Sequence, residues 1–155
     1  MKKYIKLLGV ALALILVACE ELPCDDVDGV QLNAGFYSYD GVTLSDSAIS
    51  KLILHFGLEE NTIYSDTLSG STTSVQFPFS MIADSSIVIF EFNEIDYDTL
   101  VFHYTKTLHL ESHKCGFVHY FEITSIDATN HQIDSVWIWK NIVEYGDEEN
   151  IKIYF

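Results

Sequence analysis

Short segments in which apolar and polar residues alternate fill most of the chain after residue 34. Val75, Phe77 and Phe79, for example, alternate with Gln76 and Pro78. A period of two in segments rich in β-branched and aromatic residues is typical of strands with one buried face. This pattern predicts strands at residues 35–39, 50–57, 62–68, 74–79, 86–92, 99–104, 108–112, 117–126, 134–140 and 150–155.

The segments between these strands are short and rich in Asp, Asn, Gly and Ser, which favour turns. No segment shows a sustained 3.6-residue period with caps, and only residues 45–56 are ambiguous, because Ser45 could cap a short helix. Strands joined by turns predict an all-β fold, an antiparallel β-sandwich that is Ig-like or related. Pro78 lacks a backbone N–H, so we expect its strand at a sheet edge.

The first twenty residues have a different pattern. Three lysines precede an apolar run over residues 7–17, which is shorter than the roughly 20 residues that span a bilayer. Such a run after a positive segment is typical of a secretory signal peptide. The run ends in Leu-Val-Ala-Cys, which resembles a lipobox and predicts cleavage before Cys19 with lipid attached to its thiol.

These features divide the chain into three parts. Residues 1–18 are the expected signal peptide, 19–33 the lipid anchor with an acidic tether, and 34–155 the β-sandwich domain. Two or three acyl chains would hold the protein firmly on a membrane. We therefore expect an outer-membrane lipoprotein of the cell envelope, on either the periplasmic face or the cell surface.

Charge narrows the range of partners. The chain carries a formal net charge of −15, and removal of residues 1–18 leaves five lysines against 23 acidic residues, a formal charge of −18. The sequence contains no arginine. Nucleic-acid binding requires many Lys and Arg side chains, so the composition excludes it as a function.

The three cysteines are Cys19, Cys24 and Cys115. With Cys19 lipidated, an even pair remains in a chain expected in an oxidising compartment. This predicts a disulfide between Cys24 and Cys115, while two separate thiols or an intermolecular bridge are the alternatives. A disulfide that closes a loop of this length contributes roughly 4–5 kcal/mol in the chain-entropy model.

Candidate metal ligands gather in one segment. His109, Glu111 and His113 recur at every second position, with His119 shortly after. Imidazole and carboxylate are ligands for zinc or iron. Adjacent same-face positions on a strand lie about 6.5–7 Å apart, so a site would need two of them plus His119 or His103 from a neighbouring strand. The alternative is a set of exposed polar residues, and we expect no cofactor.

Trp137 and Trp139 lie two positions apart, with Val136 before them and Ile138 between them. If the indoles are exposed, they form an aromatic platform on which sugars can stack; if they are buried, they belong to the core. Because both faces of this strand carry large apolar groups, we expect both faces to be buried.

Catalytic signatures are absent from the sequence. It contains no Gly-x-Ser-x-Gly motif, no P-loop, no dinucleotide-binding glycine pattern and no His-Glu-x-x-His motif. Asp96 and Asp98 flank a predicted turn and are interpreted as solvated. The chain is therefore not expected to be an enzyme.

Several segments together resemble an uncharacterised family of small Bacteroidota lipoproteins whose domain has no assigned function. They are the lipobox that ends in Cys19 and residues 112–117 (Ser-His-Lys-Cys-Gly-Phe), 129–136 (Thr-Asn-His-Gln-Ile-Asp-Ser-Val) and 150–155 (Asn-Ile-Lys-Ile-Tyr-Phe). Residues 66–92 carry no matching motif. The resemblance implies an outer-membrane or cell-surface location and brings no activity.

The sequence leaves three classes of function. The first is a non-enzymatic, lipid-anchored interaction or accessory module that contacts another envelope protein. The second is a glycan-binding module that uses Trp137 and Trp139. The third is a metal-dependent enzyme built on the segment from His109 to His119.

Overall fold

The computed structural model describes residues 30–41, 43–59, 62–92, 95–112 and 116–155. All regular secondary structure in these ranges is β-strand, which confirms the all-β prediction. The strands are β1 (Gln31–Tyr39), β2 (Leu44–Asp46), β3 (Ile49–Glu59), β4 (Thr62–Thr72), β5 (Ser74–Pro78), β6 (Ser85–Phe92), β7 (Asp96–Ser112), β8 (Gly116–Ala128), β9 (Ser135–Ile138), β10 (Ile142–Val143) and β11 (Ile151–Tyr154).

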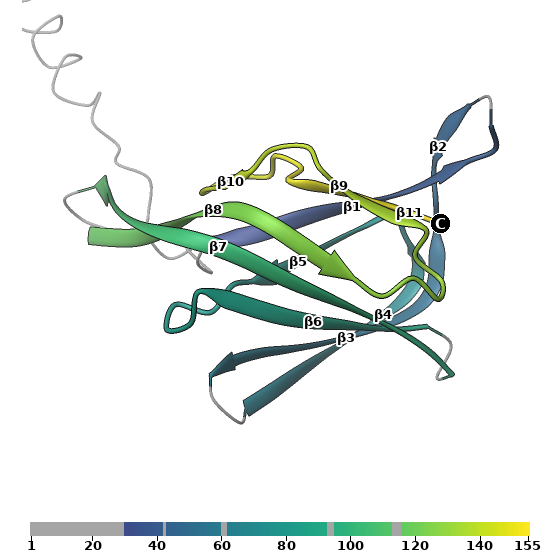
Figure 1. Ribbon diagram of the computed structural model, residues 1–155, viewed down its shortest axis with the longest axis horizontal. Helices are drawn as coiled ribbons and strands as arrows, with labels where there is room; N and C mark the ends of the chain where they lie inside the picture. Colours follow the sequence, from purple (N-terminus) through teal and green to yellow (C-terminus); the bar gives the residue numbers. More distant parts are fainter. Residues whose placement is uncertain (1–29, 42, 60–61, 93–94, 113–115) are drawn as a thin grey trace, which may run out of the picture.

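The strands form two sheets that face each other (Figure 1). Sheet A has the order β2-β1-β11-β9, and β5 pairs with β1 as well. Sheet B has the order β10-β8-β7-β6-β3-β4. The antiparallel sandwich is confirmed, with one difference: β1 and β11 are parallel, with Ala34 opposite Ile151 and Phe36 opposite Ile153.

The core lies between the two sheets and follows the alternation of the sequence. On β1, Leu32, Ala34 and Phe36 are buried, and sheet B contributes buried residues such as Leu54 and Phe102. Aromatic rings fill much of this space, and several of them meet edge to face. The burial of these apolar side chains is the main force that holds the sheets together.

Two expectations about strand boundaries need correction. Residues 31–33, assigned to the tether, lie in β1, where Leu32 is fully buried. The predicted strands at 99–104 and 108–112 are one continuous strand, β7. The polar stretch between them continues the strand because residues 105–107 stay paired in register with β8. Lys106 also donates to the carbonyls of Ile82 and Ala83 and pairs with Asp84 at 2.9 Å.

The strands β2 and β10 are not predicted from the sequence, whereas two other details agree with it. Residues 45–56 contain no helix and contribute to β2 and β3. In the described residues β5 pairs with β1 alone, so Pro78 lies at a sheet edge as predicted. Among the residues that the structure describes, no helix is long and apolar enough to cross a membrane.

Candidate functional site

The outward face of sheet A carries both tryptophans. Trp137 on β9 is 65% exposed and Trp139, just beyond the end of β9, is 66% exposed. Val136 and Ile138 point the other way and pack against the core. The expectation that both faces of this strand are buried is therefore wrong, because nothing in the described structure covers the outer side of β9.

Strand register places three tyrosines on the same face. Lys152 lies opposite Gly35 on one side and Trp137 on the other, and the next row contains Tyr37, Tyr154 and Ser135. Paired residues of neighbouring strands point to the same side of a sheet. The face, here called the aromatic face, comprises Tyr37, Tyr39, Trp137, Trp139 and Tyr154.

A groove of about 470 Å³ lies at one end of this face. Its volume is within the usual range for small-molecule sites, about 300–1,000 Å³. Apolar and aromatic side chains make up most of its lining, with polar groups at Asp134 and Ser135. The lining residues are Tyr39, Leu44, Asp134, Ser135, Trp137, Tyr154 and Phe155.

Lys152 contacts two aromatic rings in the middle of the aromatic face. The Lys152 ammonium lies 4.5 Å from the ring centre of Trp139 and 4.7 Å from that of Tyr37, which are cation–π distances. Glu149 pairs with Lys152 at 3.5 Å and accepts a hydrogen bond from the Tyr37 hydroxyl at 2.6 Å. These contacts fix the Trp139 indole beside the sheet.

Gly35 makes room for this cluster. A Cβ atom at this position would lie 1.9 Å from Oε2 of Glu149 and 2.9 Å from the Tyr37 ring. Only a residue without a side chain allows the Glu149 carboxylate to lie above the strand and reach both partners. The absence of a side chain at Gly35 therefore shapes the aromatic face.

The hydrogen bond from Tyr37 to Glu149, together with burial and the nearby negative charge, raises the pKa of Tyr37 to about 12. Replacement of the carboxylate by a neutral amide (Glu149→Gln) is expected to move the pKa of Tyr37 down towards 10. Because the folded-state pKa is raised, the stabilisation is complete below about pH 10 and disappears as pH rises through about 12. NMR titration of the tyrosine Cζ resonances measures this change.

Glu148→Gln is the matched control, because Glu148 pairs with Lys140 rather than Tyr37. An unchanged Tyr37 titration in Glu149→Gln would show that the carboxylate is not the cause of the raised pKa.

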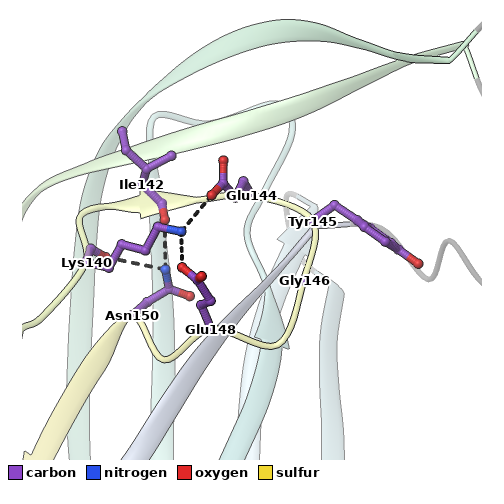
Figure 2. Close-up of a pocket in the computed structure, with 7 residues that line it drawn as sticks. All are labelled: Lys140, Ile142, Glu144, Tyr145, Gly146, Glu148 and Asn150. Atoms are coloured by element: carbon purple, nitrogen blue, oxygen red, sulfur yellow. Dashed lines mark hydrogen bonds and ion pairs between the residues drawn. The ribbon is translucent and has the colours of Figure 1, made fainter.

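A second, polar hollow of about 150 Å³ lies beside the turn between β10 and β11 (Figure 2). The Lys140 ammonium lies between the carboxylates of Glu144, at 2.6 Å, and Glu148. The hydrogen bonds that Lys140 donates to Glu144 and Glu148 raise the pKa of Lys140, and the same lysine lowers the pKa of Glu148. Asn150 donates to the Ile142 carbonyl at 2.9 Å. One ammonium faces two carboxylates, so the cluster keeps a net negative charge, and its contacts connect Lys140 to the turn before β11.

Asp98 anchors the segment that leads into β9. Its side chain is fully buried and accepts hydrogen bonds from the backbone N–H groups of His131, Gln132 and Ile133 at 2.7–2.9 Å and from the Thr129 hydroxyl at 2.8 Å. The interpretation of Asp98 as solvated is therefore wrong, whereas Asp96 is exposed as expected. Because Asp134 and Trp137 follow directly, this carboxylate positions one wall of the groove.

The structure separates the predicted metal ligands. His109 stacks on the Tyr120 ring at 4.5 Å between ring centres, and Glu111 accepts from the Tyr120 hydroxyl at 3.1 Å. His119 pairs with Leu108 and therefore points to the opposite face of the hairpin. His113 lies outside the described residues. No group of three metal-ligating side chains occurs among the residues that are described.

His103, the other neighbour considered for a metal, lies 3.3 Å from Asp127 on the exposed face of sheet B. Cys19, Cys24 and Cys115 all lie outside the described residues. The lipidation site and the disulfide therefore remain predictions.

One polar constellation was not found from the sequence. His55 lies 2.8 Å from the Ser65 hydroxyl through Nδ1 and 2.7 Å from Glu91 through Nε2. His55, Ser65 and Glu91 come from β3, β4 and β6 in that order, so no local motif identifies them. We interpret this trio as a cross-strand hydrogen-bond network.

Comparison with known proteins identifies a family whose function is unknown. A family model described as a family of unknown function, DUF6452, matches residues 51–155. No curated protein and no solved structure matches the chain. The matched part covers more than half of the chain and includes β9, β11 and the strands of sheet B, so the protein belongs to the DUF6452 family of unknown function.

Proposed function

We propose that the aromatic face binds neutral oligosaccharides. The observation that carries this proposal is the exposure of about two thirds of each of Trp137 and Trp139 on one face, next to the groove. Exposed tryptophans at adjacent same-face positions are costly to leave in water unless a ligand covers them.

The chemistry of the face suits a sugar. Indole and phenol rings offer flat apolar surfaces against the C–H face of a pyranose ring, while their polar edges stay hydrated. Asp134 and Ser135 provide hydrogen-bonding groups at the rim of the groove for sugar hydroxyls. Because the sheet and the Lys152 contacts hold Trp139 in place, little side-chain entropy is lost on binding.

The charge of the protein selects among sugars. A mature chain with a formal charge of −18 repels uronic acids and sulfated sugars. Lys152, whose ammonium lies against Tyr37 and Trp139 on the aromatic face, is already paired with Glu149. The ligand is therefore a neutral glycan.

Trp137→Ala is expected to weaken binding at least tenfold, about 1.4 kcal/mol, since it removes one stacking surface and one wall of the groove. The chain contains two tryptophans, and both lie on the aromatic face, so intrinsic fluorescence reports on the site without a label. Titration with neutral gluco-, manno- and xylo-oligosaccharides should give a saturable change in emission.

Tyr97→Ala is the matched control, because Tyr97 is an exposed aromatic residue on sheet B and its loss should leave binding unchanged. The proposal fails if none of these sugars changes the fluorescence at millimolar concentration. A stoichiometric envelope protein that co-purifies with the chain and is lost in Trp137→Ala would instead assign the face to a protein partner.

We also propose that the protein is a lipid-anchored envelope protein, acylated at Cys19, in which Cys24 and Cys115 form a disulfide. The positive segment, the apolar run and the lipobox support the anchor, and the even cysteine pair supports the disulfide. A glycan-binding domain on a lipid anchor would hold oligosaccharides close to the membrane surface.

Cys19→Ser, exported with the cleavable signal peptide of a soluble protein in place of residues 1–18, is expected to move from the detergent phase to the aqueous phase in a cloud-point partition, since acyl chains then supply the membrane affinity. Cys24→Ser is the control and should stay in the detergent phase. Equal partition of the wild type and Cys19→Ser would contradict lipidation at this residue.

A further inference from the structure

The hairpin of β7 and β8 extends beyond the sandwich and exposes its inward face. Tyr104 and Phe121 are the last buried residues of that face. Beyond them, Leu108 is 56% exposed, Leu110 is 45% exposed, and Phe117, which pairs with Leu110, is 64% exposed. These three side chains, here called the hairpin apolar face, continue the core face of sheet B without cover from the described part of sheet A.

The start of β1 lies at the root of this hairpin. Val30 is 7% exposed and belongs to the core, and Gln31 pairs with Pro78. Phe79 follows and packs edge to face against Phe121 at 5.5 Å. Figure 1 shows the start of β1 and the end of the hairpin on the same side of the molecule. The segment before Val30 therefore begins next to the hairpin apolar face.

The length and the charge of residues 20–29 both suit the hairpin apolar face. Residues 20–29 can span up to about 33–36 Å, whereas the four residues from Phe117 to Phe121 rise about 13 Å. The segment combines five acidic residues with the apolar Leu22, Pro23 and Val27. The inward positions of the hairpin carry His119 and Lys106, which is paired with Asp84, and no carboxylate in the described residues, although the chain is strongly acidic.

We propose that residues 20–29 fold back over the hairpin apolar face and cover Leu108, Leu110 and Phe117 with their own apolar side chains. The leader is then a structural part of the domain rather than a free tether. It fixes the orientation of the domain relative to a membrane anchor at Cys19. This inference does not depend on glycan binding.

The proposed disulfide would fasten the same arrangement. Cys24 lies six positions before Val30, and Cys115 lies six positions before Phe121. Equal sequence separations from two core residues suit a disulfide between Cys24 and Cys115 in the proposed arrangement. Its formation removes two electrons and two protons from the thiols, which pass to the disulfide of an exported thiol oxidase by thiol–disulfide exchange.

Hydrogen-exchange mass spectrometry of the full mature lipoprotein in detergent tests the proposal. Changing Leu22 and Val27 together to Asp is expected to speed amide exchange in residues 105–112 and 116–120 at least tenfold and to increase binding of a hydrophobic dye. Asp25→Asn is the matched control and should leave both unchanged. Because the substitutions lie outside the described domain, an unchanged tryptophan emission verifies that the domain stays folded.

Unchanged exchange of the hairpin in the double variant would overturn the proposal. A dimer that dissociates in Phe117→Ser would assign the face to a second copy, and protection that appears only in lipid bilayers would assign it to the membrane; either result would also overturn it. A non-reducing peptide map separates the two ideas, because covered hairpin residues with free Cys24 and Cys115 support the docking and reject the disulfide.

Discussion

Asp98→Asn is expected to lower the free energy of unfolding by about 2–4 kcal/mol. The carboxylate accepts hydrogen bonds from three backbone N–H groups and one hydroxyl while its side chain is fully buried. An amide of the same shape presents N–H groups to at least some of these donors, so buried groups lose their partners. Bonds to a charged acceptor are worth about 1.5–3 kcal/mol each, and unsatisfied buried donors cost more than lost contacts.

The contribution of Asp98 to the free energy of unfolding also depends on pH. Burial alone would raise the pKa of Asp98, but the N–H groups of Gln132, His131 and Ile133 and the Thr129 hydroxyl together lower it below its ordinary value. A lowered folded-state pKa means that the stabilisation is present above about pH 4 and disappears as pH falls towards the folded-state pKa. The stability difference between wild type and Asp98→Asn should therefore narrow below about pH 4.

Urea unfolding at pH 7 and at lower pH measures both effects. Asp96→Asn is the control, because the exposed Asp96 contacts the Gln132 side chain at 3.2 Å and should change stability by less than about 0.5 kcal/mol. If Asp98→Asn unfolds at the wild-type urea concentration, the anchoring role assigned to this carboxylate is wrong.

Phe79→Ala is expected to lower the free energy of unfolding by about 3–5 kcal/mol. Phe79 is buried and stacks on Tyr104 at 4.4 Å, with Phe102 at 5.3 Å and Phe121 at 5.5 Å between ring centres. It follows β5 of sheet A directly and contacts β7 and β8 of sheet B. Its removal leaves a cavity between the sheets and ends three aromatic contacts.

Thermal unfolding followed by circular dichroism measures this loss. Met81→Ala is the matched control, since Met81 lies two residues further along with its side chain 67% exposed. The control should stay within about 0.5 kcal/mol of wild type. Equal stability of the two variants would contradict the position of Phe79 as a link between the sheets.

The sequence predicts the strands well because apolar and polar residues alternate within each one. It predicts poorly which face of a strand packs against the core. Trp137 and Trp139 lie on one face, as their spacing predicts, although Trp139 lies just beyond the end of β9. Which face meets the core depends on β11 and β1, and the apolar Val136 and Ile138 made both orientations reasonable. The groove was missed for the same reason, because its walls come from residues near both ends of the described chain.

Long-range partners explain why the sequence could not place Asp98 and His119. Nothing near Asp98 in the sequence predicts its burial, because the groups that bind it are more than 30 residues away. The period of two placed His109 and Glu111 together, but the face of His119 depends on how β8 pairs with β7 after the turn. The residues next to Asp98 and His119 in the sequence therefore do not predict the burial of Asp98 or the face on which His119 lies.

The parallel pairing of β1 with β11 also sets an order of assembly. Asn33, at the beginning of the described chain, binds Asn150 through its backbone N–H at 3.0 Å, 117 positions later. The pairing of β1 with β11 cannot form until residues 151–154 have been synthesised, and contacts of such long sequence separation form slowly. Sheet A therefore closes after all the other strands that the structure describes have been synthesised.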